Sequence, residues 1–414
     1  MTLTDTRQLD FDTVTASPRR ILAATVALVL GGFAIGTTEF VTMGLLPQIA
    51  DGLSVSIPSA GHAISAYAAG VVIGAPVFAV IGARFRRRVL LVAFMVLFTI
   101  GNVLSALAGS YGLLIAARFL AGLPHGAFFG VAALVAVAMA PPGRGGRAVG
   151  QVMLGIPVAN ILGVPLATWV GQTLGWRSAY WLVGVIGLAT VVAVALVVPN
   201  TPHNAEATVR SELSALAEPQ VWLTLLIGAV GFGGMFAMYS YIAPTVTEVT
   251  HLSERAVPVF LLAFGLGGLV GTPLGGRLAD WSVLRTMALG SVLTAALLAL
   301  FTLTASYAVP AVATLFLIAV VISMFVVTLQ IRLMTVAGDA QTLGAASNHA
   351  ALNFANALGA WLGGLVIARG WGYTAPSWVG VGLSLAGLVL IGASVRLHVR
   401  DRDRAHVPAA AAAR

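Results

Sequence analysis

Two oppositely charged side chains fall inside long apolar segments of this 414-residue sequence. Glu39 lies between Thr38 and Thr42, and Arg118 follows in a later apolar segment. Because a charge at membrane depth is costly, such residues are functional candidates by default. Proton coupling requires a carboxyl group whose protonation responds to what occupies a cavity. We therefore predict that Glu39 and Arg118 serve proton coupling. Thr38 and Thr42 are predicted to border a substrate cavity. The alternative for Glu39 and Arg118 is a structural ion pair that locks two helices.

The segment that carries Arg118 also contains a histidine and a glycine stripe. Glycines recur at every fourth position from Gly122 to Gly130, and Pro124 favours a kink. His125 follows Arg118 by seven residues, which is two helical turns, so both side chains lie on about the same face. His125 is a candidate for binding substrate or relaying protons, and a hydrogen-bonded packing role is the alternative.

Amide and imidazole side chains mark a segment near the C-terminus. His349, Asn353 and Asn356 follow one another at i, i+4 and i+7, so they form a polar stripe on one helix face, with Asn348 beside it. This stripe either faces a water-filled cavity or bonds to a neighbouring helix, and we favour the cavity. Tyr239, late in another apolar segment, is a weaker cavity candidate that could instead belong to an interfacial aromatic belt.

The fifth apolar segment combines residues that bend and thin a helix. It contains Gly155, Pro157, Gly163 and Pro165, with the amide of Asn160 between them. We predict that this helix is a pliable interface between two halves of the molecule. Asn160 is a further cavity candidate.

Enzyme motifs are nearly absent from the sequence. It contains no HExxH motif, no Walker loop and no pair of carboxylates at membrane depth. With no cysteine there is neither a thiolate metal site nor a cysteine nucleophile. We therefore predict a protein that is not an enzyme and that needs no metal and no cofactor.

The composition excludes an ordinary soluble protein. Only 9% of the residues are charged, 59% are hydrophobic, and the mean hydropathy is +0.97. Soluble domains carry about 25% charged residues. The net charge of +8 could suggest nucleic acid as a partner, but the basic residues sort by membrane side, so no nucleic-acid partner is expected.

Twelve apolar runs are long enough to cross a bilayer as helices. The predicted spans are 21–46, 59–81, 89–109, 112–139, 147–171, 178–198, 221–244, 256–278, 285–305, 309–331, 344–367 and 375–396. Strands of an outer-membrane barrel would be about half as long and alternating, so we predict an all-α integral membrane protein.

The arginines predict the orientation of these spans. All basic residues are arginines, and eighteen of them fall on one side of the predicted topology, against three on the other side and Arg118 inside a span. The positive-inside rule then places both termini in the cytoplasm. The expected location is the bacterial cytoplasmic (inner) membrane.

The two halves of the sequence repeat one another. At a shift of 197 residues Gly70 meets Gly267 and Gly74 meets Gly271, so each half holds a GxxxG pattern that allows close helix packing. Two parallel six-helix bundles are therefore predicted. Their order along the chain is an N-terminal tail 1–20, a first bundle 21–198, a linker 199–219, a second bundle 220–396 and a C-terminal tail 397–414.

Together these residues resemble the major facilitator superfamily, in its twelve-span drug:H+ antiporter branch. The loop signature of that family is visible as the run from Gly276 to Asp280 followed by Arg285, and it is degenerate in the first half, where Ala83 stands at the place of Asp280. The resemblance implies a role in conformational gating for the residues of these two loops, namely Gly74, Arg84, Arg88, Gly276, Arg277, Asp280 and Arg285.

The resemblance also bears on the proton and substrate sites. Arg118 falls at the arginine of the family's fourth-helix motif, which the family uses in proton transfer, and the fifth helix resembles the antiporter signature, with Gly-Val-Pro at 163–165. The stretches 38–40, 56–62 and 122–130 look like the arabinose-induced sugar-efflux subfamily, near the chloramphenicol exporters.

We therefore expect a secondary transporter that exports a small organic solute, a sugar or a drug, in exchange for protons by alternating access. Its expected partners are the solute, protons and the lipid bilayer, and we expect a monomer. A proton-coupled uptake symporter is one alternative. The other is a membrane sensor that binds a ligand without transporting it.

Overall fold

The structure, a computed structural model, describes residues 17–82, 85–141, 145–200, 218–337 and 341–406. Within these ranges every regular element is a helix. Twelve spans are long and apolar enough to cross a membrane, and each begins and ends within a few residues of its prediction, the second lying in the helix Ile57–Gly82. The predicted all-α fold with twelve membrane spans is confirmed.

The first half contains six spans, several of them built from more than one helix. Its elements are α1 (Pro18–Gly44), α2 (Leu46–Gly52), α3 (Ile57–Gly82), α4 (Arg87–Ala106), α5 (Tyr111–Gly122), α6 (His125–Met139), α7 (Gly145–Met153), α8 (Gly155–Val158), the π-helical turn η1 (Ala159–Gly163), α9 (Val164–Leu174) and α10 (Trp176–Val197). The fourth span is interrupted at Pro124, so the predicted kink is confirmed.

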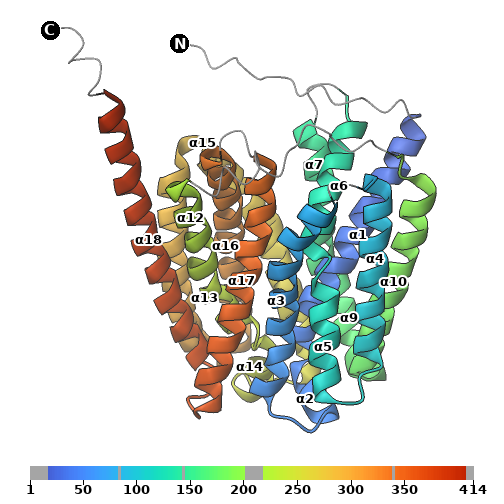
Figure 1. Cartoon of the computed structure of the whole chain (residues 1–414). Coiled ribbons are helices and arrows are strands. Elements are labelled where there is room, and N and C mark those ends of the chain that lie inside the picture. Colours follow the sequence, from blue (N-terminus) through green and yellow to red (C-terminus); the bar gives the residue numbers. More distant parts are fainter. Residues whose placement is uncertain (1–16, 83–84, 142–144, 201–217, 338–340, 407–414) are drawn as a thin grey trace, which may run out of the picture.

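The second half follows the same plan. Its elements are α12 (Pro219–Leu226), the π-helical turn η3 (Ile227–Gly231), α13 (Gly233–Tyr239), α14 (Ile242–Glu248), η4 (Glu254–Ala256), α15 (Val257–Thr304), α16 (Ala308–Val336), α17 (Gln341–Ala368) and α18 (Ala375–His406). Helix α15 joins two spans across a kink at Ser282, whose backbone is extended. Figure 1 shows the two halves as neighbouring bundles, with the start of α1 and the end of α18 at the same end of the molecule.

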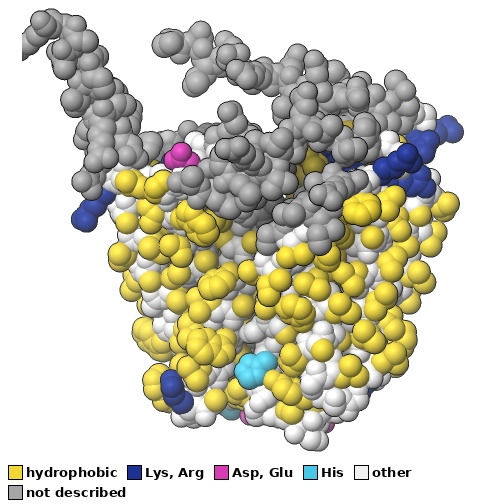
Figure 2. Space-filling view, viewed as in Figure 1, with side chains coloured by type: hydrophobic (Ala, Val, Ile, Leu, Met, Phe, Trp, Pro, Cys, Tyr) yellow, Lys and Arg dark blue, Asp and Glu magenta, His cyan; other side chains and the backbone are white. Residues whose placement is uncertain are grey.

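The outer surface is apolar at the level of the spans. Large hydrophobic side chains such as Leu188, Trp281 and Val389 are more than half exposed. Figure 2 shows hydrophobic side chains over the middle of the visible face and basic side chains toward its ends. Several polar side chains are instead buried between the helices, Glu39 and Arg118 among them. This distribution suits a protein whose surroundings are lipid.

The internal repeat of the sequence is visible in the structure as a helix-packing contact that occurs in both halves. A methyl group at Gly70 of α3 would collide with the carbonyl oxygen of Phe119, and a methyl group at Gly267 of α15 would collide with that of Phe316. Both residues of each contact are shifted by the same 197 positions. The second glycine of each pattern repeats the contact one turn later. The GxxxG patterns therefore pack equivalent helices in both bundles, as the sequence predicts.

The two bundles touch from mid-depth to the end opposite the start of α1. Helix α3 packs along α17, and η1 and α9 pack against α15. The Ser65 hydroxyl donates to the carbonyl of Ala357 at 3.3 Å, and the Gln172 amide donates to the carbonyl of Glu254 at 2.8 Å. These contacts hold the bundles together at the far end of the molecule.

Candidate functional site

Arg118 is fully buried and held by Thr38. Helix α5 begins at a Ser110 cap and carries Arg118 to mid-depth, opposite α1. The Arg118 guanidinium donates from Nη1 to Thr38 Oγ1 at 2.9 Å and from Nη2 to the Thr38 carbonyl at 3.0 Å. Thr38 Oγ1 donates in turn to Asn102 Oδ1. A chain of hydrogen bonds therefore joins α5, α1 and α4.

Glu39 is buried but unpaired. Its side chain is 6% exposed, and the structure gives its carboxylate no hydrogen bond and no ion pair within the described ranges. Arg118 lies within electrostatic range of Glu39 but directs its hydrogen bonds to Thr38. The described residues therefore contain no ion pair that locks the two helices, which was the structural alternative for Glu39 and Arg118.

Two tyrosine rings surround the Arg118 guanidinium. The guanidinium carbon lies 4.4 Å from the ring centroid of Tyr67 and 5.3 Å from that of Tyr180. The hydroxyl groups of Tyr180 and Thr42 are hydrogen bonded at 2.8 Å. Ring faces attract a cation through their quadrupole, so they stabilise a buried arginine that has no carboxylate partner.

His125 connects this cluster to the second bundle. It begins α6 directly after the helix break at Pro124 and is 1% exposed. Its Nδ1 lies 3.1 Å from the Tyr67 hydroxyl, whereas its buried Nε2 has no hydrogen-bond partner in the part of the chain that the structure describes. Its ring centroid is 6.2 Å from that of His349 on α17, and the His349 ring stacks in parallel on Phe129 at 5.2 Å.

The polar stripe of α17 has unmet hydrogen-bonding capacity. Asn353 donates to the carbonyl of His349 at 3.0 Å, and Asn348 donates to Gln330 Oε1. Asn356 is fully buried, and among the described residues neither its Oδ1 nor its Nδ2 has a hydrogen-bond partner. Because buried polar groups are nearly always hydrogen bonded, a stripe with such unpaired groups suits a site for water or a polar ligand.

Tyr239 is buried among aromatic rings. It is 1% exposed, its ring stacks on Phe264 at 4.0 Å, and it meets the edge of Phe40 from the first bundle at 6.1 Å. A side chain in this position does not belong to an aromatic belt at the lipid interface, so that alternative is wrong.

The fifth span has the irregular build that its sequence predicts. Its backbone forms the π-helical turn η1, which contains Asn160 and ends at Gly163, and Pro165 follows at the start of α9. Methyl groups at Gly155 and Gly163 would collide with α1, and the Asn160 carbonyl approaches Gly265 of the other bundle. Pro157 lies in α8 between these contacts. Single π-helical turns are frequent at functional sites.

The loop residues implied by the family resemblance have different surroundings. Gly74 packs against the backbone of Leu123, whereas a methyl group at Gly276 would meet open space. The Arg285 guanidinium lies 5.5 Å from the ring centroid of Trp281. Arg88 is half-buried and Arg277 is exposed. Arg84 and the side chain of Asp280 lie outside the described parts of the structure, and gating by all seven residues stays a prediction.

Sequence reasoning missed several contributors to this site, Tyr67 above all. Tyr67 aligns with Phe264 in the repeat, so the feature of the sequence that could have identified Tyr67 is the hydroxyl group that Phe264 lacks. Tyr180 and Phe129 have no comparable signal, because each is an ordinary residue of an apolar helix until its neighbours in space are known. Asn102 is an amide in an apolar segment, so the criterion that singled out Asn160 applied to it as well.

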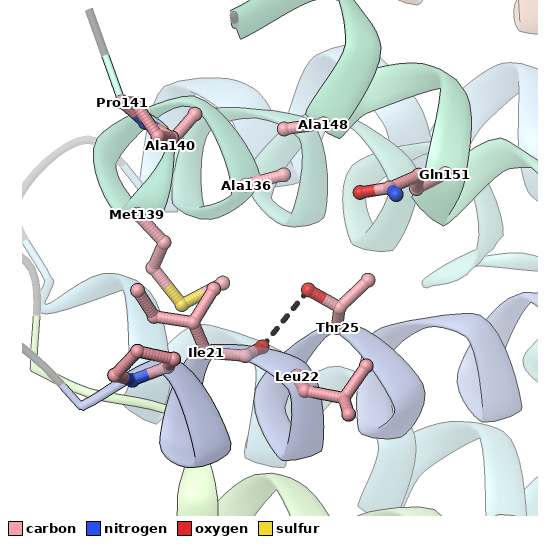
Figure 3. Close-up of a pocket in the computed structure, with 10 residues that line it drawn as sticks. Ile21, Leu22, Thr25, Ala136, Met139, Ala140, Pro141, Ala148 and Gln151 are labelled. Carbon is pink, nitrogen blue, oxygen red and sulfur yellow. Dashed lines mark hydrogen bonds between the residues drawn. The ribbon is translucent and has the colours of Figure 1, made fainter.

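Two surface cavities lie away from Glu39. One of about 460 Å³ lies between the start of α1, the end of α6 and α7. Figure 3 shows its side chains, which include Ile21, Leu22, Thr25, Ala136, Met139 and Gln151. A more apolar one of about 700 Å³ lies between α15 and α16. In the described ranges no group of three or more His, Cys, Asp or Glu side chains could hold a metal ion.

Comparison with known families finds one match that covers most of the chain. The sequence profile of the Major Facilitator Superfamily matches residues 28–348. The chain is 40% identical to the inner membrane transport protein YdhP of Escherichia coli, over 88% of this chain and 94% of that protein.

Two further relatives have names that refer to resistance or efflux. The chain is 31% identical to a chloramphenicol resistance protein of Streptomyces lividans, over 86% of this chain and 92% of that protein. It is 30% identical to a probable sugar efflux transporter of Helicobacter pylori, over 87% and 92%.

Among solved structures, the fold is similar to that of a D-xylose-proton symporter. The TM-score is 0.72 over 90% of this chain and 97% of the other, at 17% sequence identity. At this identity the similarity concerns the fold alone.

Proposed function

This chain belongs to the Major Facilitator Superfamily and is a multi-pass membrane transporter, and we propose that it exports a small organic solute in exchange for protons. In this proposal Glu39 carries the proton. Arg118 responds to the charge on Glu39 from its position against Thr38, and the stripe of His349, Asn353 and Asn356 contacts the solute.

The unpaired, buried carboxylate of Glu39 carries this proposal. An ionised carboxylate without a partner is costly at membrane depth, and the neutral acid is much less so. A nearby guanidinium favours the ionised form, and Arg118 is within electrostatic range. A solute that enters beside Glu39 changes this balance, so solute binding and proton release become linked.

Alternating access supplies the movement. We propose that the bundles 21–198 and 220–396 rock against each other about the η1 turn and the contacts between α3 and α17. In the proposed topology, with both termini in the cytoplasm, the far-end contacts lie on the periplasmic side of the membrane. The arginine distribution supports this orientation. The proposed unit is a monomer, because each chain holds a complete pair of bundles.

The names of two relatives support export rather than uptake. One is a probable sugar efflux transporter and another is a chloramphenicol resistance protein. Sugars and amphipathic drugs are therefore the two solute classes to test first.

The test uses purified protein in liposomes with an imposed pH gradient and a pH dye inside. Sugars, then neutral drugs and then cationic drugs are added one at a time. We expect one class to collapse the gradient with wild-type protein and to leave it intact with Glu39→Gln. The direction of solute movement in oriented vesicles separates antiport from uptake, since a symporter moves solute and protons the same way. Binding of a compound without any solute flux would contradict transport of that compound and favour a sensor.

A further inference from the structure

We propose that Tyr67 is a positioning residue that links the proton site to the interface between the two bundles. This inference rests on the proposed function. Its ring face holds the Arg118 guanidinium, and its hydroxyl group holds His125 against His349 of the second bundle. A change of charge at Glu39 then reaches the bundle interface through one side chain.

The ring of Tyr67 fixes the position of Arg118. The guanidinium carbon lies 4.4 Å from the ring centroid, and both side chains are almost fully buried. Thr38 holds the guanidinium through two hydrogen bonds, so ring and hydrogen bonds together define its plane. Glu39, which follows Thr38 directly, is within electrostatic range of both Arg118 and Tyr67. Loss or gain of charge at Glu39 therefore acts on the Arg118 guanidinium, whose position the Tyr67 ring helps to fix.

The hydroxyl group of Tyr67 acts on a different neighbour. It lies 3.1 Å from Nδ1 of His125, and the two rings are tilted at a centroid distance of 5.8 Å. His125 in turn lies 6.2 Å from His349, which stacks in parallel on Phe129. These ring contacts join α3 and α6 of the first bundle to α17 of the second. A movement of Tyr67 must therefore shift a contact across the bundle interface.

The internal repeat shows which residues of the second bundle correspond to the residues of this chain of contacts. At the 197-residue shift that the packing glycines confirm, Tyr67 corresponds to Phe264, Arg118 to Leu315 and His125 to Ile322. Phe264 stacks on Tyr239 and has no hydroxyl group with which to hold a further residue. The second bundle keeps the same packing without the polar chain. Packing alone therefore does not account for the tyrosine hydroxyl at position 67.

The charged and titratable groups that face this chain come from five helices. They are Glu39 from α1, Arg118 from α5, His125 from α6, Tyr180 from α10 and His349 from α17. Glu39 has no other described ionic partner that would take up its change of charge. Tyr67 is the one side chain in direct contact with both Arg118 and His125 among the contacts that the structure describes.

The test follows the distance between the bundles as the pH changes, with no solute present. Because the chain lacks cysteine, Val89→Cys and Leu289→Cys, both exposed, introduce two unique sites for spin labels. Pulsed electron paramagnetic resonance in liposomes then gives the population of each bundle arrangement across an acid-to-alkaline titration. Wild-type protein should change its population with a defined midpoint, and Glu39→Gln should abolish the change.

Tyr67→Phe and Tyr67→Leu separate the two roles of the side chain. Tyr67→Phe keeps the ring over Arg118, so the midpoint should stay unchanged while the amplitude falls by more than half. Tyr67→Leu also removes the ring, so the midpoint should shift as well. Tyr111→Phe is the matched control, because the Tyr111 hydroxyl also contacts a histidine Nδ1, that of His62, but on the exposed far end of the molecule. The Tyr111→Phe variant should leave both the midpoint and the amplitude of the population change at their wild-type values.

Full amplitude in a folded Tyr67→Phe protein would overturn the role of Tyr67 while leaving the proposed function intact. If wild-type protein shows no change of population, or if Glu39→Gln retains it, proton coupling through Glu39 fails and the role of Tyr67 fails with it. If Tyr67→Leu does not fold, the amplitude of Tyr67→Phe still decides.

Discussion

Arg118 holds Thr38 at two points, donating from Nη1 to its Oγ1 at 2.9 Å and from Nη2 to its carbonyl oxygen at 3.0 Å. Hydrogen bonds from a charged group contribute about 1.5–3 kcal/mol each. With these bonds and two aromatic faces, the buried guanidinium is stabilised without a carboxylate. Glu39, the next residue along α1, is consequently left without a hydrogen bond or ion pair among the described residues.

The unpaired amide of Asn356 predicts opposite effects on stability and function. Leucine at this position has a similar size and removes two unsatisfied polar atoms, so Asn356→Leu should leave the melting temperature unchanged or raise it, while transport falls. Thermal unfolding in detergent and solute flux in liposomes measure the two effects.

Asn102 provides the matched control for this comparison. It is equally buried, but it accepts a hydrogen bond from Thr38 and donates one to the carbonyl of Phe98 at 2.9 Å. Asn102→Leu should therefore destabilise the fold by about 1–3 kcal/mol. A large loss of stability in Asn356→Leu would show that its amide is satisfied, and would contradict its assignment to the solute site.

The close contact between Gly74 and Leu123 predicts a packing defect. A methyl group in Gly74→Ala would collide with the Leu123 backbone, so the two helices must separate. Overpacking of this kind costs about 1–3 kcal/mol. Gly382→Ala, where the methyl group meets open space, is the control and should unfold at the wild-type temperature. Equal melting temperatures for the two variants would argue against this close helix contact.

Much of the architecture was predictable from the sequence, and the reasons are visible in particular residues. Lipid requires each span to be a long apolar helix, so the pattern of hydropathy predicts twelve spans. The glycines at positions 70 and 267 predict equivalent packing in both halves, because only small residues allow backbones to approach so closely.

The site was predictable only in part. Glu39, Arg118 and His349 stand out because they are polar in apolar segments. Tyr67 does not, because its importance depends on lying between Arg118 and His125, which come from different helices. Likewise, the preference of Arg118 for Thr38 over Glu39 is a matter of side-chain geometry, which spacing along the chain does not determine.

The contact between Gly61 and Tyr241 predicts that a larger side chain at position 61 keeps the far ends of the two bundles apart. Tyr241 donates a hydrogen bond to the carbonyl of Ala360 at 2.7 Å, and its hydroxyl lies where a side chain at Gly61 would go. Gly61→Val should therefore prevent the far ends of the bundles from closing. A cysteine introduced by Ser65→Cys should then react several-fold faster with a membrane-impermeant maleimide.

Gly112→Val is the control for this labelling experiment. Gly112 lies at the same end of the molecule, but a side chain there meets open space. It should leave the labelling rate of the Ser65→Cys protein unchanged. Identical labelling rates in the two glycine variants would contradict the closing role of the Gly61–Tyr241 contact.

Tyr373, which lies outside the spans, predicts a loss of stability at alkaline pH. Burial, and to a lesser extent the Glu248 carboxylate, raises the pKa of the Tyr373 phenol above its ordinary value of about 10. The folded protein therefore retains this proton at a pH where the unfolded chain has lost it. The stabilising contribution is fully present below about pH 10 and is lost as the pH rises through the raised pKa.

Tyr373→Phe tests this pH dependence. The variant should lose less stability than wild-type protein when the pH rises above about 10, and the two should have the same pH dependence in the neutral range. Thermal unfolding across an alkaline titration measures the difference. Parallel curves over the whole titration would contradict the raised pKa.

The proposed role of Glu39 as the carrier of the transported proton can be tested by comparing two fluxes in liposomes that contain wild-type or Glu39→Gln protein. The first is accumulation of the exported solute driven by a pH gradient. The second is exchange of labelled for unlabelled solute without a gradient. We predict that Glu39→Gln loses accumulation but retains exchange, because the neutral amide still permits solute binding and bundle movement without a proton. Accumulation at the wild-type rate by Glu39→Gln would show that Glu39 does not carry the proton.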